Sequence, residues 1–347
     1  MKNFISFHLD SNPITVIGLN KVINELKKFD NSWNYNKGEI RRNPKYLTKE
    51  IIGENYILQN KNLSNDVLIL NGIGIYEDEL LNDIQNLKNY SNIKNLIFTR
   101  QELSEKIIKS ISDNLKSIPK LLNIELGENN LNDEGIIILS EGIKNLVNLE
   151  TLDLKSNNIK SNGMKSLSNI LKYLTKLKVL NLNYNKISDD GLISLSKINL
   201  SSLEIILLKD NNIEVKGMKE FSKNLKNFSK LIHIDLSLNN IGDDGLNDFI
   251  LYMNNLKNLK FLLLSNNDIS DDSFINFVKN LDKINNLESL FLWDNIIGDK
   301  GAEEFLNNLK KYPNLKHIDL TINDITVDIK NKFKEFSHKN KGLFIDI

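Results

Sequence analysis

The segment LETLDLKSNNIKSNG, residues 149–163, contains the pattern that decides the fold. Leucine or isoleucine occupies its places 1, 4, 6 and 11, asparagine its place 9 and glycine its place 15. Places 2 to 7 alternate between polar and apolar residues, which is typical of a strand with one buried face. After the turn, Met164, Leu167, Leu171 and Leu174 recur at helical spacing. The segment therefore predicts one strand followed by one helix.

The same frame recurs along nearly the whole chain at steps of 28 residues, with one step of 26. Its clearest copies begin at Leu121, Leu149, Leu177, Leu203, Leu231, Leu259, Leu287 and Leu315. Weaker copies begin at Phe4, at about Asp30, at Asn65 and at Ile93, which gives about twelve units. Since no unit can bury its apolar face alone, the units must stack side by side.

This pattern resembles the leucine-rich repeat family, specifically its long ribonuclease-inhibitor type. The resemblance implies an α/β solenoid shaped as a horseshoe, with a parallel sheet on the concave face and helices on the convex face. We expect one domain over 1–347, made of divergent N-terminal repeats and a cap at 1–64, regular repeats at 65–325 and a C-terminal cap at 326–347. The ending KNKGLFIDI predicts a last strand that closes the array.

Composition narrows the function classes. Acidic and basic residues balance at 45 each and no basic run is sustained, so we expect no nucleic-acid partner. The chain has no cysteine, hence no disulfide framework and no thiolate metal site. No apolar run approaches the roughly 18 residues that a membrane span requires. We expect a soluble cytoplasmic protein that is monomeric in isolation.

No catalytic motif is recognisable in the sequence. There is no P-loop or zinc-binding helix motif, and the pairs His233–Asp235 and His317–Asp319 are interpreted as exposed polar residues of two distant strands. The aspartate pairs near helix starts, such as Asp189 with Asp190, favour capping of the helix over metal binding. We therefore predict no catalytic site of the chain's own, no metal and no cofactor.

Places 3, 5, 7 and 8 of each unit should face the concave side. In the C-terminal half these places hold large apolar residues, and we predict a protein-binding surface at Leu207, Leu238, Phe261, Leu263, Phe291 and Trp293. The alternative is that these neighbours only shield one another. The middle units are instead acidic, at Glu125, Glu128, Asp153 and Asp210.

Arg100 is one of only three arginines in a chain with 42 lysines, and it occupies place 8 of the unit from Ile93. Its planar, forked donors can grip a carboxylate or backbone carbonyls in fixed geometry. A surface ion pair with Glu102 or Glu128 is the simpler interpretation. However, the segment 97–131, IFTRQELSEKIIKSISDNLKSIPKLLNIELGENNL, resembles the segment of Ran GTPase-activating proteins in which an FTGR motif carries the functional arginine.

That resemblance implies a protein partner, a Ran-like small GTPase, whose own catalytic glutamine and water become ordered on binding. It implies contacts from Arg100, Glu128 and the turn at Ser156 and Asn157. Here the glycine of the motif is missing, Ser156 stands where the family has asparagine, and the family's acidic tail is absent. The alternative function is a non-catalytic adaptor or inhibitor that binds a folded protein through the concave face.

Overall fold

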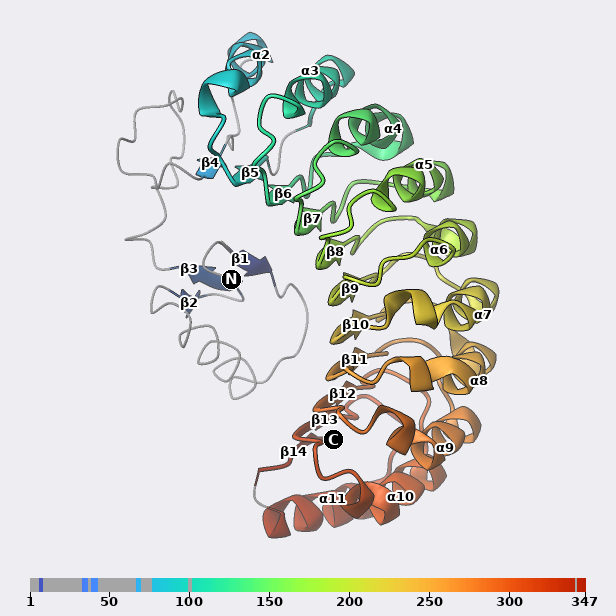
Figure 1. Ribbon diagram of the computed structural model, residues 1–347. Coiled ribbons are helices and arrows are strands. Elements are labelled where there is room, and N and C mark those ends of the chain that lie inside the picture. The colour runs from blue at the N-terminus through green and yellow to red at the C-terminus, as the bar shows by residue number, and fades with distance from the viewer. Residues whose placement is uncertain are drawn as a thin grey trace.

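The repeated units form one curved sheet lined by helices. The computed structural model describes residues 6–8, 33–36, 39–42, 67–69, 77–98, 102–340 and 342–347. Eleven strands, β4 to β14, pair in parallel and in chain order, and the helices follow one another along the outside of the arc (Figure 1). The predicted solenoid, with the sheet inside and the helices outside, is confirmed.

Every strand of this sheet has three residues and is followed by a helix, except the last. The strands are β4 Val67–Ile69, β5 Asn95–Ile97, β6 Asn123–Glu125, β7 Thr151–Asp153, β8 Val179–Asn181, β9 Ile205–Leu207, β10 His233–Asp235, β11 Phe261–Leu263, β12 Ser289–Phe291, β13 His317–Asp319 and β14 Phe344–Asp346. The helices are α2 Glu77–Gln85, α3 Glu105–Leu115, α4 Asn132–Ile143, α5 Ser161–Leu171, α6 Ser188–Ser196, α7 Val215–Lys223, α8 Gly242–Tyr252, α9 Asp271–Lys279, α10 Asp299–Asn308 and α11 Val327–Lys339.

Short 3₁₀ turns, η1 Leu87–Tyr90, η2 Leu225–Phe228, η3 Met253–Asn255, η4 Leu281–Ile284 and η5 Leu309–Lys311, connect five of the helices to the next strand. They continue the apolar stripe of the helix into the core, since Leu225 and Phe228 are fully buried. The return from helix to strand is thereby part of the packed layer.

The inward places of the repeat carry the core, as the period predicts. In the unit from Leu203, the side chains of Leu203, Ile206, Leu208 and Ile213 have no exposed surface. Neighbouring strands pair without offset, so residues at the same place form rows across the sheet; Ile206, for example, lies between Leu180 and Ile234. One continuous apolar cluster thus runs through the array instead of a separate core for each unit.

The asparagine at place 9, which we call the ladder asparagine, joins each turn to its neighbours. The Asn157 side chain donates from Nδ2 to the carbonyl oxygens of Leu126, Leu154 and Lys155 at 2.7, 3.0 and 3.1 Å. Its Oδ1 accepts from the backbone N–H groups of Asn129 and Leu131 at 3.1 and 3.2 Å. Because these backbone groups are buried, the side chain supplies partners that water cannot.

The aspartates near the helix starts cap helices, but not their own. Asp189 lies inside α6, and its Oδ1 accepts from the N–H of Glu214, the residue before α7, at 2.8 Å. The same bond links Asp271 to Gly298 at 2.7 Å. The expectation that each aspartate caps its own helix was wrong, because the carboxylate reaches the next unit. In some units the same aspartate explains the glycine at place 15, since a Cβ on Gly217 would lie 2.3 Å from Asp189 Oδ1.

The two ends of the chain differ from the regular units. Strand β14 pairs in parallel with β13, which confirms the predicted closing strand. The N-terminal strands β1 Ser6–His8, β2 Trp33–Asn36 and β3 Glu39–Arg42 form a separate three-stranded antiparallel sheet. The strands of the two units expected from Phe4 and Asp30 therefore lie outside the parallel sheet. Each of the other ten units contributes one strand to it. The boundaries at 64 and 326 stay a prediction.

Candidate protein-binding surface

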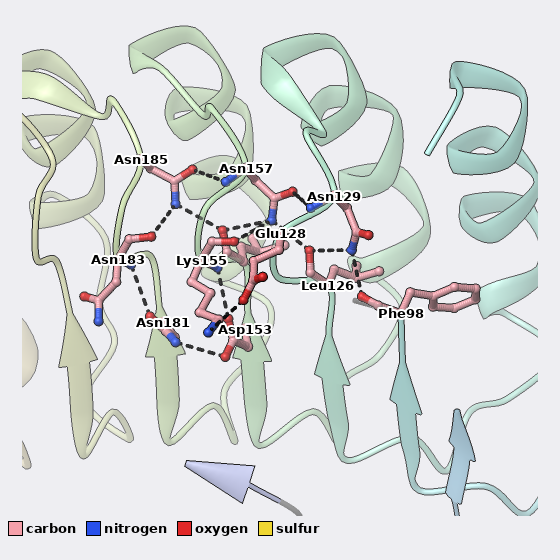
Figure 2. A network of polar contacts seen from close by, with 11 residues as sticks. Phe98, Leu126, Glu128, Asn129, Asp153, Lys155, Asn157, Asn181, Asn183 and Asn185 are labelled. Carbon is pink, nitrogen blue, oxygen red and sulfur yellow. Dashed lines mark hydrogen bonds and ion pairs between the residues drawn. The ribbon is translucent and has the colours of Figure 1, made fainter. Parts of the chain in front are cut away.

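The centre of the concave face is a network of polar side chains (Figure 2). Lys155 Nζ lies 3.1 Å from Glu128 Oε1, and the backbone N–H of Lys155 donates to Asp153 Oδ1 at 2.9 Å. Asn181 donates from Nδ2 to Asp153 Oδ2 at 2.9 Å and accepts the N–H of Asn183 at 3.1 Å. These contacts run from strand to strand, so the outward side chains of units 121 to 177 are already fixed without a partner.

Glu125 lies in the same region, paired in register with Asp153 on the next strand. Burial and then the charge of Asp153 raise the pKa of Glu125, and Lys155 partly opposes them, which leaves the pKa at about 8. Part of the Glu125 surface remains exposed, but two carboxyl groups on adjacent strands still disfavour a second charge, which supports a raised pKa. At neutral pH Glu125 therefore carries a proton and can donate a hydrogen bond.

The predicted GTPase-contact residues divide into exposed and buried positions. Glu128 and Ser156 are partly exposed in successive turns, both with left-handed backbone at φ values of 63° and 54°. Asn157 is fully buried, and its amide is used by the turn itself. Any contribution of Asn157 to a contact must come through the shape of the turn.

Arg100 lies outside the described residues. Among the described residues before it, Phe98 accepts at its carbonyl oxygen from Asn129 Nδ2 at 2.7 Å. The N–H of Phe98 donates to Glu125 O at 2.8 Å, which fixes this strand end against the unit that carries Glu128.

The predicted apolar surface is partly closed by its own neighbours. Leu207, Leu238, Phe261 and Trp293 are partly exposed, whereas Leu263 and Phe291 retain 3% and 4% of their surface. Leu263 and Phe291 nevertheless lie apart from the main apolar cluster beneath the helices. The outward register is therefore as predicted, and these two side chains form the floor of the surface rather than its exposed contacts.

Aromatic contacts explain how this floor is closed. The ring of Phe291 packs edge-on against His317 with centroids 4.8 Å apart, and the ring of Phe261 lies 5.5 Å from His233. The indole Nε1 of Trp293 is buried and has no hydrogen-bond partner among the described residues. An unpartnered indole N–H in a site that a partner would cover is typical of a residue that gains contacts on binding.

Contrary to expectation, three of the four residues of the His-x-Asp pairs, Asp235, His317 and Asp319, are buried, and His233 is only partly exposed. Asp235 and Asp319 retain 3% and 1% of their surface, and burial raises the pKa of both carboxyl groups. Burial lowers the pKa of His233 to about 4. His317 Nε2 instead contacts Asp346 Oδ2 of the closing strand at 2.8 Å. Period-two patterning predicted the facing of these residues, but their burial depends on the large side chains on either side.

Two lysines of the concave face were not recognised from the sequence. Lys209 is 2% exposed, with its Nζ 5.4 Å from the centre of the Tyr184 ring, and Lys155 is 7% exposed. Both lysines occupy place 7 of their units. The sequence signal for their burial was the residue at place 8 of the preceding unit, the acidic Glu128 for Lys155 and the aromatic Tyr184 for Lys209. The aliphatic part of each lysine side chain covers the sheet. The charge of Lys155 contacts Glu128, and that of Lys209 lies over the Tyr184 ring.

Metal chemistry and membrane insertion find no support in the part of the chain that the structure describes. No group of three or more His, Asp or Glu side chains there is arranged to hold a metal ion. Among those residues, no helix has the length and apolar character to cross a membrane.

The fold and its open, curved sheet define the class: the chain has the leucine-rich repeat solenoid fold. In agreement, a profile of the family described as "Leucine Rich repeat" matches residues 145–168, 173–196 and 229–248. No curated protein matches the chain.

Solved structures with a similar fold include an internalin (inlF) from Listeria monocytogenes, with 24% identity over 76% of this chain and 70% of that chain, and a TM-score of 0.48. Another is the ectodomain of the plant receptor kinase GASSHO1/SCHENGEN3 from Arabidopsis thaliana, solved in complex with CASPARIAN STRIP INTEGRITY FACTOR 2, with 17% identity and a TM-score of 0.42. That match covers 78% of this chain and 34% of the ectodomain. Neither likeness identifies a partner.

Proposed function

We propose that the chain is a protein-binding scaffold and, in its most specific form, an activator of a Ran-type small GTPase. The observation that carries the specific form is the rim at Glu128 and Ser156. These residues lie in adjacent turns, because the N–H of Glu128 bonds to Lys155 O at 2.9 Å and that of Ser156 to Asn183 O at 2.8 Å. Arg100 stands at the same place of the preceding unit.

Such a rim suits activation without catalytic chemistry of its own. Phosphoryl transfer requires positioning and electrostatic stabilisation more than covalent work by the protein. A partner bound across the rim would meet Arg100 and the carboxylate of Glu128, while the polar network behind them holds the turns still. The network supports this role, since Lys155 already pairs with Glu128 and leaves the position of its carboxylate defined.

The test is phosphate release from GTP-loaded Ran in the presence of catalytic amounts of the chain. We expect multiple turnovers that are lost in Arg100→Ala and retained in Lys106→Ala, a change at an exposed residue of α3. Acceleration that survives Arg100→Ala, or no acceleration at all, contradicts activation.

The apolar half of the concave face favours a second candidate function, an adaptor or inhibitor that binds another folded protein. Its support is the partly exposed set of Leu207, Leu238, Phe261 and Trp293 above the closed floor of Leu263 and Phe291. Tryptophan is among the residues enriched in binding hot spots, and Trp293 is the member of this set that fits that description. Binding that Trp293→Ala abolishes and Arg100→Ala leaves unchanged would distinguish the adaptor from the activator.

A further inference from the structure

A second surface, away from the rim at Glu128 and Ser156, lies on the turns of the last two complete units. Place 8 is Glu, Ser, Tyr, Asp, Leu or Asn and place 10 is Asn, Lys or Asp in the units from Leu121 onward, except at Ile322 and Ile296. These two isoleucines are 68% and 51% exposed. They are the β-branched apolar residues that these turns present to water, so neither contributes to the core.

The two turns lie side by side. The N–H of Asp294 donates to Thr321 O at 2.9 Å, and Gly298 forms a parallel bridge with Asp324. The sequence is Asp294-Asn295-Ile296 in one turn and Ile322-Asn323-Asp324 in the next, so apolar and acidic residues alternate in both directions. We call these six residues the C-terminal turn surface.

Ile322 also has an unfavourable backbone. Its φ is 56°, in the left-handed region, where asparagine, aspartate and glycine are accepted and β-branched residues are rare. Place 8 has this backbone in all eight units from Leu121 onward, where it carries Asn266 and Asp294 but also Tyr184 and Leu238. Ile322 is the β-branched residue among them, and it is also the exposed apolar one. Such an outlier motivates a search for a function.

The charge around the isoleucines is strongly acidic. The turn segments 265–273, 293–301 and 321–329 contain seven aspartates and one lysine, Lys300. Asp271 and Asp299 are occupied, because each accepts a hydrogen bond from the next unit. Asp268, Asp272, Asp324 and Asp328 are exposed, and within the described residues none of them forms an ion pair. This surface repels anionic lipid and nucleic acid and attracts cations.

We propose that the C-terminal turn surface binds a basic amphipathic segment of a partner protein, with Ile296 and Ile322 as apolar anchors and with Asp324 and the neighbouring Asp328 as charge partners. Alternating apolar and acidic residues fit a segment in which apolar residues alternate with lysine or arginine. The site lies in other units than Glu128 and Ser156 and does not depend on GTPase activation.

The test uses a labelled synthetic peptide in which leucine alternates with lysine, and a counterpart with glutamate in place of lysine. Fluorescence anisotropy on the full chain should show binding of the lysine peptide that weakens at least tenfold in the double variant Ile296→Asn/Ile322→Asn. Asp324→Asn/Asp328→Asn should reduce both the affinity and its salt dependence. The glutamate peptide should not bind.

Leu251→Asn is the matched control, since Leu251 is 64% exposed on α8 outside this surface. Equal binding by the wild type and the double isoleucine variant, or an equal loss in Leu251→Asn, overturns the proposal. So does sedimentation in which the isoleucine variant alone converts a dimer to a monomer, because a second copy is then the occupant. Thermal unfolding of Ile322→Asn should show an unchanged or higher Tm; a lower Tm means that Ile322 serves the fold, which also overturns the proposal.

Discussion

The concave sheet has two halves that share one backbone frame but differ in how their outward side chains are held. In units 121 to 177 polar groups bond across strands, as Asn181 does to Asp153 at 2.9 Å. In units 259 to 315 rings and aliphatic groups cover one another, which leaves Phe291 4% exposed. The difference teaches that inward places fix the fold in both halves, whereas outward places are free to vary in chemistry. Binding specificity must therefore be encoded in the outward rows.

Two neighbouring residues on β8 provide the strongest test of this difference between inward and outward places. Leu180 faces inward and is fully buried, so Leu180→Ala should lower the free energy of unfolding by about 2–5 kcal/mol. Asn181 faces the concave side, and Asn181→Ala should cost only about 0.5–1.5 kcal/mol, the usual net value of a hydrogen bond. Urea unfolding measures both. Equal losses in the free energy of unfolding would show that outward places stabilise the fold as much as inward places do.

The ladder asparagine should come next in magnitude. Asn157→Ala removes partners from two buried N–H groups and from three carbonyl oxygens. We expect a loss of about 1–3 kcal/mol in the free energy of unfolding. Asn162→Ala, at an exposed position near the start of α5, is the control and should change stability by less than about 0.5 kcal/mol. A small effect at Asn157 would contradict the role assigned to the ladder.

In the polar half, Glu125 should make the stability of the chain depend on pH. In the unfolded chain this carboxyl has its ordinary pKa of 4.5, and in the folded chain the pKa is raised to about 8. The folded state therefore binds the extra proton between these values, so this group's contribution is complete below pH 4.5 and is lost as the pH rises to about 8.

Glu125→Gln keeps the hydrogen-bonding shape without the charge. The variant should be more stable than the wild type at pH 9 by about 1 kcal/mol or more, since one pKa unit corresponds to about 1.4 kcal/mol. The difference in urea midpoint between variant and wild type, followed from pH 5 to pH 9, measures it. A difference that does not change with pH means that Glu125 is ionised throughout.

The smallest effect should come from ion pairs at the edge of the sheet. Lys178 contacts Glu150 at 2.9 Å, and both side chains keep more than a third of their surface exposed. Because exposed pairs are screened by water and salt, Lys178→Ala should cost about 0–1 kcal/mol and less in high salt. If Lys178→Ala lowered the free energy of unfolding as much as Asn157→Ala does, the Lys178–Glu150 pair would stabilise the fold more than its exposure indicates.

Particular residues show what the sequence could predict. The period of 28 residues was enough to place Ile206 inward and Phe291 outward, because facing depends only on alternation along a strand. The burial of Phe291 could not be predicted, since it depends on His317 of the next strand. The capping by Asp189 was assigned to the wrong helix for the same reason: the partner is supplied by the following unit.

The candidate site was predictable to a smaller extent. Glu128 and Ser156 occupy the same place of adjacent units, which predicted that they lie along one rim. The backbone hydrogen bonds between neighbouring turns agree with that prediction. Burial of Asn157 follows from the ladder, which the sequence also indicated. The lysines Lys155 and Lys209 were missed because their burial requires the neighbouring strands that pair with them or cover them.

Hydrogen exchange of the chain with and without GTP-loaded Ran tests most directly whether the concave rim is the contact. Binding at the rim should slow exchange in the turns 126–130 and 154–158 and leave the helices α4 and α5 unchanged. Protection confined to the helices, or no protection at any concentration of Ran, would contradict it.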